Sequence, residues 1–68
     1  MASSDALEEC RELVIATQFG STSMLQRRLR LPHQQVIQIM ERLEREGVVG
    51  PRNPDGYRDV LVKPGGGR

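Results

Sequence analysis

Apolar residues in the first part of the chain recur every three or four positions, the spacing of a helix that buries one face. This face consists of Leu7, Cys10, Leu13 and Val14. Acidic residues crowd the first turns of the same segment, where they complement the helix dipole. The pattern predicts a first helix over residues 5–17, capped by Ser4 or Asp5, with Gly20 at the stop or turn that follows.

A second, shorter helix is predicted after a Ser-Thr-Ser segment. Thr22 is β-branched, and we expect it to contribute to a short strand. Ser23 is then expected to be the N-cap of a helix over residues 24–30. The buried side of this helix is predicted to consist of Met24, Leu25 and Leu29.

A proline separates this helix from a third one. Pro32 disfavours a helical conformation at the residue before it and is well accommodated in a first helical turn. The third helix is therefore predicted to begin at Pro32 or His33 and to end at Glu46, before Gly47. Its core stripe is expected to comprise Val36, Ile39, Met40 and Leu43. Ile37 lies beside this stripe and is expected to be half-buried.

The last part of the chain is predicted to form a β-hairpin. Residues 48–50 and 57–62 are rich in β-branched side chains and are predicted as two strands. Residues 51–56 between them have the proline, asparagine, aspartate and glycine content of a turn. The order of helix, short strand, helix, turn, helix and hairpin predicts a winged helix-turn-helix, a mostly helical α+β fold with three helices and a small wing.

Length and composition limit the chain to one small domain. We expect it to span residues 5–63, between a flexible start at 1–4 and a flexible tail at 64–68. Aromatic residues make up 3% of the 68 residues, so the core must consist of Leu, Ile, Val and Met. No apolar run approaches the roughly 20 residues needed to cross a membrane. The predicted location is cytoplasmic without direct membrane contact, and any membrane anchor of a parent protein would lie outside these residues.

The residue types present argue against catalysis and metal binding. Cys10 is the single cysteine, which excludes an internal disulfide, and we expect a buried and inert thiol. His33 is the single histidine and has no partners suited to a metal site. No nucleophile–base pair or carboxylate dyad is recognisable, and residues 65–67 lack the context of a phosphate-binding loop. We therefore predict that the domain is not an enzyme and takes no cofactor or metal.

The charges are unevenly placed although the net charge is only +1. Residues 1–20 carry four acidic residues against one arginine, a net charge of −3. Residues 21–68 carry nine lysines or arginines against five acidic residues, a net charge of +4. A polyanion would therefore meet the second part of the chain first. An ordinary mixed surface is the alternative.

The third helix of such a fold is the one that enters the major groove of DNA. Gln34 and Gln38 lie four positions apart on one face, away from Met40 and Leu43, and glutamine pairs with adenine through N6 and N7. The predicted base-reading residues are His33, Gln34, Gln35 and Gln38. Solvated glutamines on a helix surface are the alternative.

Three arginines and three hydroxyl residues flank this helix and are candidates for phosphate contact. They are Arg27, Arg28, Arg30, Ser21, Thr22 and Ser23. Hydroxyls and free N–H groups at a helix N-terminus can hold a phosphate. The alternatives are plain N-capping by Ser23 and pairing of one arginine with Glu41 or Glu44.

The hairpin supplies a further group of DNA-contact candidates, namely Arg52, Asn53 and Arg58. An arginine at a wing tip reaches the minor groove or the backbone, whereas Asp55 would oppose this slightly. A solvated turn is the alternative. Two arginines of the third helix are instead expected to form ion pairs with Glu41 and Glu46; these are Arg42 and Arg45.

Two parts of the chain resemble one family. Residues 20–30, Gly-Ser-Thr-Ser-Met-Leu-Gln-Arg-Arg-Leu-Arg, resemble the start of the C-terminal gamma domain of FtsK/SpoIIIE-type DNA translocases. Residues 40–51, Met-Glu-Arg-Leu-Glu-Arg-Glu-Gly-Val-Val-Gly-Pro, and residues 59–64, Asp-Val-Leu-Val-Lys-Pro, resemble its later part. The resemblance covers about residues 6–64. It implies a domain that recognises short, oriented sequences in double-stranded DNA and so directs a hexameric motor.

The resemblance also implies partners. These are other copies of the domain on the hexameric motor and, in chromosome-segregating members, a tyrosine recombinase. Related plasmid-transfer translocases of the TraB kind use a similar domain to recognise plasmid repeats. The chain departs from the family pattern at Gln35 and Gln38, where basic residues are usual. This favours a different DNA signal and a plasmid-transfer or otherwise divergent member.

The predicted winged helix and the resemblance together imply a guide domain that binds double-stranded DNA sequence-specifically. The resemblance further implies that it orients or loads a motor, for chromosome segregation or conjugative plasmid transfer. A different class remains open, because many winged helices dock proteins, and a neutral third helix suits a module that docks a recombinase or another partner. A small transcription regulator is a further alternative, although it would need a dimerisation element for which the chain has no spare helix.

Overall fold

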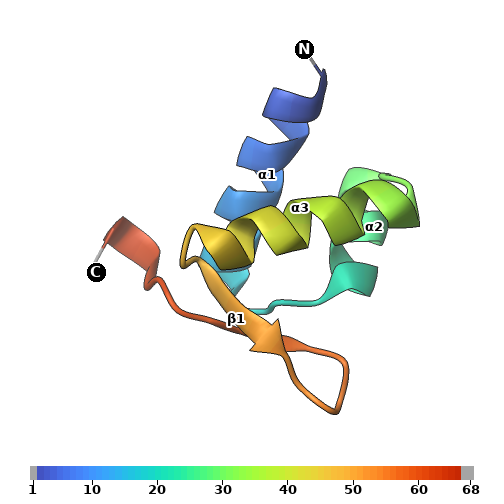
Figure 1. The fold of residues 1–68 in the computed structure, drawn as a ribbon. Helices are drawn as coiled ribbons and strands as arrows, with labels where there is room; N and C mark the ends of the chain where they lie inside the picture. The colour runs from blue at the N-terminus through green and yellow to red at the C-terminus, as the bar shows by residue number, and fades with distance from the viewer. Residues whose placement is uncertain (1, 67–68) are drawn as a thin grey trace.

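The computed structural model describes residues 2–66, which form three helices followed by a two-stranded antiparallel sheet and a short 3-10 turn (Figure 1). The elements are α1 (Ala2–Thr17), α2 (Thr22–Leu29), α3 (His33–Arg45), β1 (Val49–Arg52), β2 (Arg58–Val60) and η1 (Pro64–Gly66). The predicted mostly helical α+β fold with a small β-hairpin wing is therefore confirmed. The expectations for Met1, Gly67 and Arg68 lie outside the described residues.

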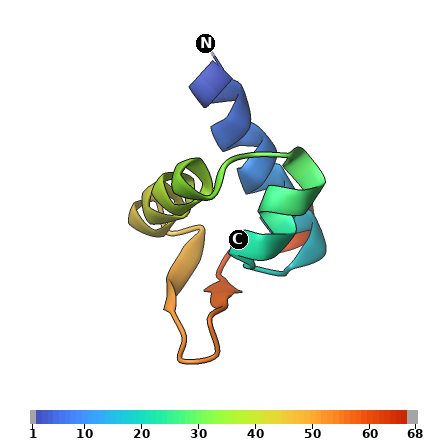
Figure 2. The same cartoon turned by 90° about the vertical axis from the view of Figure 1, so that its right-hand side faces the viewer.

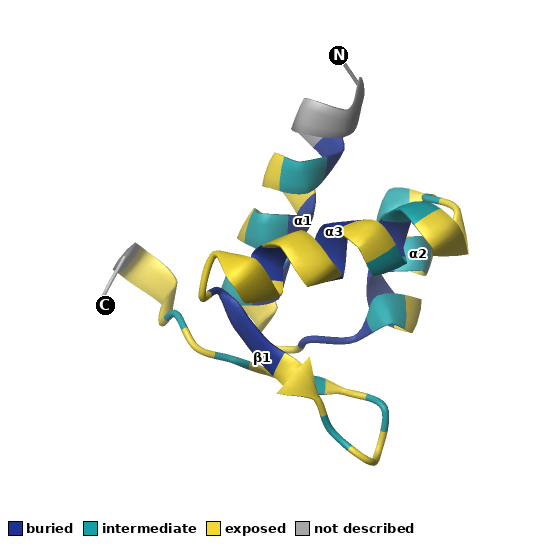
Figure 3. Ribbon diagram, in the orientation of Figure 1, coloured by how far each residue is buried: buried dark blue, intermediate teal, exposed yellow. Residues whose placement is uncertain are grey.

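The core lies where the three helices meet the base of the sheet, and α3 is its main contributor (Figure 3). The whole predicted stripe of this helix is buried, namely Val36, Ile39, Met40 and Leu43. Ile37 is half-buried, as its place beside the stripe predicted. Leu25 of α2 and Val49 of β1 are completely buried against this stripe, and together they join the helices to the wing.

The first helix begins earlier than predicted and presents a slightly rotated face. It starts at Ala2, so the predicted start at Asp5 is wrong, because nothing in these residues stops a helix and alanine favours one. Cys10 and Val14 are completely buried, as expected. Leu7 and Leu13 are only half-buried, and Ala6 takes a core position instead.

The N-cap of α2 is Ser21 and not Ser23. Ser21 has extended backbone angles, φ −113° and ψ 123°, and its hydroxyl accepts a hydrogen bond from the Met24 N–H at 3.1 Å. The expected strand at Thr22 is therefore wrong, since Thr22 is the first helical residue. A cap at Ser21 leaves Met24 and Leu25 inside the helix, where both are buried.

The end of α2 is one residue earlier than predicted. Arg30 adopts the left-handed conformation, with φ 56°, and serves as the C-cap. The chain then reaches Pro32, which is extended with ψ 149° and precedes the first residue of α3. The predicted break at Leu31-Pro32 is confirmed.

A glycine closes α3 at the predicted place. Gly47 has φ +82°, a conformation that strains other residues, and its N–H donates to the Glu44 carbonyl at 3.0 Å. The Val48 N–H donates to the Leu43 carbonyl at 2.9 Å. These two bonds form a Schellman motif, which turns the chain from α3 directly into β1.

The hairpin pairs Val49 with Val60 and Arg52 with Arg58, with a register irregularity between these pairs. Its strand boundaries differ from the predicted ones, because β1 extends through Pro51 to Arg52 and β2 covers only Arg58–Val60. In place of the strand expected at Thr22, the segment before α2 forms a single bridge, from Gly20 to Arg58. The wing is thus attached to the segment between α1 and α2 as well as to α3.

The wing tip and the N-terminal end of α1 lie at opposite ends of the molecule in both ribbon views (Figure 2). Within residues 2–66, no helix is both long enough and apolar enough to span a bilayer.

Replacement of Met40 by alanine is expected to destabilise the domain. Met40 is 1% exposed in the centre of the core, and removal of such a side chain costs about 2–5 kcal/mol. Thermal unfolding followed by circular dichroism would measure this as a melting temperature lower by roughly 10 °C or more, with exposed Glu12→Ala as the control. A Met40→Ala variant that melts with the wild type would contradict the core placement.

Candidate nucleic-acid interface

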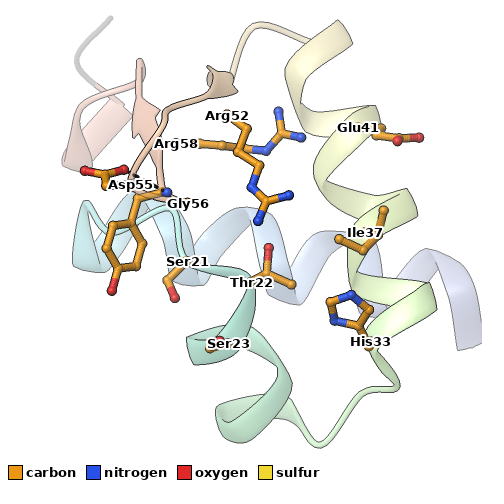
Figure 4. A pocket seen from close by; sticks show the side chains of 11 residues that line it. Ser21, Thr22, Ser23, His33, Ile37, Glu41, Arg52, Asp55, Gly56 and Arg58 are labelled. Atoms are coloured by element: carbon orange, nitrogen blue, oxygen red, sulfur yellow. Dashed lines mark hydrogen bonds between the residues drawn. The ribbon is translucent and has the colours of Figure 1, made fainter.

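A cleft of about 400 Å³ lies between the N-terminus of α2, one side of α3 and the wing (Figure 4). The α2 end contributes three hydroxyl residues, and the wing contributes arginines and the turn around Gly56. Three elements that are distant in sequence therefore meet at one concave surface.

The side of α3 that faces this cleft is defined by His33, Ile37 and Glu41, which follow one another at intervals of four residues. Of the predicted base-reading residues, the cleft lining therefore includes His33. Gln34 and Gln38 are exposed on the adjacent outer face of the helix, and Gln35 is half-buried.

Glu41 is a potential functional residue that the sequence analysis assigned only to ion pairing. It lines the cleft, and its exposed carboxylate points away from the wing (Figure 4), where it could accept a hydrogen bond from the N4 amino group of cytosine. Its spacing of eight residues from His33 was the available signal. The sequence does not show which side of α3 faces the wing, so this spacing acquires its meaning only from the fold.

A side-chain contact connects the two helices of the helix-turn-helix at the edge of the cleft. His33 Nδ1 lies 2.9 Å from the side-chain oxygen of Gln26 on α2. This contact restrains the imidazole ring, so a DNA contact by His33 would use the other ring nitrogen, Nε2.

The hydroxyl residues at the start of α2 differ in their availability. Ser21 is 3% exposed, and its hydroxyl accepts the capping hydrogen bond described above. Thr22 is half-buried and Ser23 is exposed, and both line the cleft. Their backbone N–H groups lie in the first helical turn, where they have no intrahelical acceptor. This end of α2 is therefore suited to an anion.

The three arginines of the α2 region also differ in position. Arg27 shares a shallow surface depression with Ser23 and Gln26, next to the cleft. Arg28 and Arg30 are exposed but are not among the residues that line the cleft. The geometry therefore brings Arg27 closest to the predicted phosphate-binding end of α2.

The wing tip is held by several hydrogen bonds. The Gly56 N–H donates to the Asn53 carbonyl at 2.9 Å, and the Asn53 N–H donates to the Tyr57 carbonyl at 2.7 Å. The Tyr57 N–H also donates to an Asp55 carboxylate oxygen at 3.0 Å. Arg52 is exposed, and its side chain points across the cleft toward Thr22 (Figure 4).

Arg58 has a different environment from the one expected for a DNA contact. Its side chain is 14% exposed, and its guanidinium pairs with Glu44 on α3 at 2.9 Å. The same Nη1 atom donates to the Gly50 carbonyl at 3.0 Å. Pairing of Glu44 with an α2 arginine was the alternative to phosphate contact, and Glu44 instead pairs with Arg58 on the wing.

A second ionic cluster lies at the C-terminal end of α3. Arg42 pairs with Glu46 at 2.9 Å, as predicted from their spacing, and Glu46 also pairs with Arg11 of α1. The hydrogen bond from Arg11 is the largest cause that lowers the pKa of the Glu46 carboxyl. Desolvation opposes it, while the charge of Arg11 and the pairing with Arg42 lower the pKa further. The link to Arg11 spans 35 residues, so sequence spacing could not reveal it.

Cys10 fits the prediction of a buried thiol. Burial, with a smaller effect of the Glu9 charge, raises the pKa of this thiol to about 11, which disfavours the nucleophilic thiolate. Among the described residues, no group of histidine, cysteine and carboxylate side chains is placed to hold a metal ion.

Comparison with known proteins identifies one family. A family model described as the FtsK gamma domain matches residues 2–63. The chain is 50% identical over 60 residues to the DNA translocase FtsK of Streptomyces coelicolor, which covers 88% of this chain and 6% of that protein. The same protein of Mycobacterium tuberculosis is 47% identical over 60 residues, with 88% and 7% covered. That of Corynebacterium efficiens is 50% identical over 60 residues, with 88% and 6% covered.

The chain spans less than a tenth of the length of these relatives. The matching model is that of the gamma domain and not of an ATPase motor, which confirms the prediction that this domain is not an enzyme.

The pairing of Glu46 with Arg11 is expected to make stability depend on pH. Because the pKa of Glu46 is lower in the folded state, its stabilising effect is present above the pKa of the unfolded chain and is lost as pH falls through the folded pKa. Glu46→Gln should therefore be less stable than the wild type near neutral pH, and this difference should shrink in acid. Urea unfolding at neutral and acidic pH measures both values. A difference that is constant with pH would contradict the assignment.

Proposed function

Because the chain belongs to the FtsK gamma domain family, we propose that it binds double-stranded DNA and reads its base sequence. The single observation that carries this proposal is the convergence of the α2 N-terminus, α3 and the wing around one cleft. Such an arrangement lets one helix enter a groove while the flanking elements contact the backbone. The cleft-lining residues described here come from these three elements and not from the acidic helix α1.

The base-reading role is proposed for α3. Its buried stripe faces the core, so the exposed Gln34 and Gln38 are turned toward solvent, where a major groove could receive them. Glutamine favours adenine, and Glu41 in the cleft would favour cytosine. His33 would contact a base through Nε2. Gln35 is the least accessible of the four predicted base-reading residues.

Backbone contact is proposed for the elements on either side of α3. Thr22, Ser23 and Arg27 would hold one phosphate region, with Arg28 and Arg30 further along the same strand. Arg52 and Asn53 on the wing would reach the neighbouring minor groove or its backbone. Such contacts position the domain without carrying sequence information themselves.

The role in a larger protein is also a proposal. The relatives are named as DNA translocases, and a guide domain in such a protein would orient or load the motor on DNA. Several copies on a hexamer would raise the effective concentration of a weakly binding domain. Such a motor would act in chromosome segregation or in plasmid transfer. In chromosome segregation the domain would also contact a tyrosine recombinase.

One observation supports protein docking as a second candidate function. The rings of Phe19 and Tyr57 pack against each other at an angle of 41°, with centroids 5.1 Å apart. The exposed fractions of these residues are 43% and 44%. Aromatic side chains are enriched at protein interfaces. A docking surface of this kind would bind a partner with little dependence on salt, unlike contacts to phosphates.

Selection from a random duplex library, with the purified domain at low and high salt, distinguishes the two functions. DNA reading predicts a short enriched motif and an affinity that falls steeply as salt rises. If no motif is enriched and no salt-dependent binding is found, even with the domain artificially trimerised, the DNA-reading proposal is wrong and protein docking is favoured.

Arg27→Ala is expected to weaken binding to all duplexes to a similar extent. Loss of one phosphate contact should reduce the slope of log affinity against log salt by about 1. Arg42→Ala is the control, because it removes the same charge from a residue that pairs with Glu46. Fluorescence anisotropy at several salt concentrations measures the slopes. An unchanged slope for Arg27→Ala would rule out its phosphate contact.

Gln38→Ala and Gln34→Ala are expected to relax sequence preference at individual base pairs. A base contact is worth about 1–3 kcal/mol of discrimination, and an adenine preference should disappear at the affected position. Repeating the library selection with each variant tests this directly. A motif identical to that of the wild type would show that the glutamines do not read bases.

A further inference from the structure

We propose that Glu44 is a positioning residue for DNA recognition. By pairing with Arg58 it holds the wing against α3 and so determines where Arg52 lies relative to the base-reading face of α3. This inference rests on the proposed function, but its structural part can be measured without DNA.

The Arg58 side chain is occupied by its ion pair with Glu44. Its guanidinium donates to Glu44 Oε1 at 2.9 Å, and its side chain is only 14% exposed. A phosphate contact by the same group would have to break the pair with Glu44. The contribution of Arg58 to recognition is therefore indirect, through the position of the wing.

The register irregularity in the hairpin supplies the second partner of Arg58. Between the two residue pairs of the ladder, Gly50 and Pro51 on β1 lie opposite the single residue Asp59 on β2. Such a bulge disrupts the local ladder and bends the strand. The Gly50 carbonyl at this bulge accepts from Arg58 Nη1 at 3.0 Å. One guanidinium thus bonds both the bend in β1 and the last turns of α3.

A backbone contact fixes Arg58 from the other side. The Arg58 N–H donates to the Gly20 carbonyl at 3.0 Å. A Cβ atom on Gly20 would lie 2.3 Å from the Arg58 carbonyl oxygen, so only glycine permits this approach. The wing is therefore held between the segment before α2 and the side chain of Glu44.

A change in the position of Arg58 would also move Arg52. The two residues are paired across the hairpin, and the tip between them is closed by its own hydrogen bonds. A tilt of the strand at Arg58 would therefore carry Arg52 with it. Glu44 itself has an exposed side-chain fraction of 43% and lies outside the core, so its removal should change the wing without unfolding the domain.

The structural test compares Glu44→Ala with Glu44→Gln by NMR. Both variants lose the same charge, but glutamine keeps an oxygen that can accept from Arg58. Residual dipolar couplings would report the orientation of residues 49–60 relative to α3. We expect a changed or averaged wing orientation in Glu44→Ala and a wild-type orientation in Glu44→Gln, with the helices unchanged in both. Gly20→Ala should displace the wing from its opposite side.

The functional test repeats the library selection with the same variants. We expect Glu44→Ala to lose roughly fivefold or more in discrimination at base pairs next to the wing, and to keep the preferences read by α3. Glu44→Gln should retain both sets of preferences.

The outcomes separate this inference from the proposed function. An unchanged wing orientation in Glu44→Ala overturns the positioning role, whatever happens to DNA binding. A displaced wing with unaltered base preferences overturns its importance for recognition. A wild-type domain without any sequence preference overturns the proposed function, while the NMR result still decides whether Glu44 positions the wing.

Discussion

Burial of one stripe of α3 is the constraint on which the rest of the structure depends. Val36, Met40 and Leu43 are at most 1% exposed, and they pack against α1, α2 and the base of the wing. Because a helix is rigid, burial of this stripe obliges Gln34 and Gln38 to face solvent. The same packing therefore provides both the stability of a small domain and the orientation of its proposed reading face.

The surface around α3 is built by contacts between residues that are distant in sequence. The Gly20 backbone and the Glu44 side chain hold the wing through Arg58, while Arg11 joins α1 to the end of α3 through Glu46. These contacts use charged residues that a sequence reader would assign to solvent. A small domain with a limited core can in this way place its wing with hydrogen bonds rather than with additional apolar burial.

The family membership and the residues of α3 together indicate how recognition could vary within one fold. The scaffold needs an apolar stripe, a capped α2 and a wing held against α3, and none of these depends on the side chains that we propose to face the groove. Gln35 and Gln38 occupy positions where the resemblance implied basic residues, and the exposed Gln38 can change without a cost to the core. The proposed preference for adenine follows from this chemistry alone.

The three helices, the hairpin and the fold class could be predicted from the amino-acid sequence, because hydrophobic periodicity and the signals of Pro32 and Gly47 are local. The sequence also identified the core stripe of α3 and the Arg42–Glu46 pair, which depend only on helical spacing. Tertiary structure decided the rest. The cap of α2 is set by the hydrogen bond between Met24 and Ser21, and the surroundings of Glu41 and Arg58 depend on where the wing lies. Distances across a fold depend on packing between separate elements, and no local pattern encodes them.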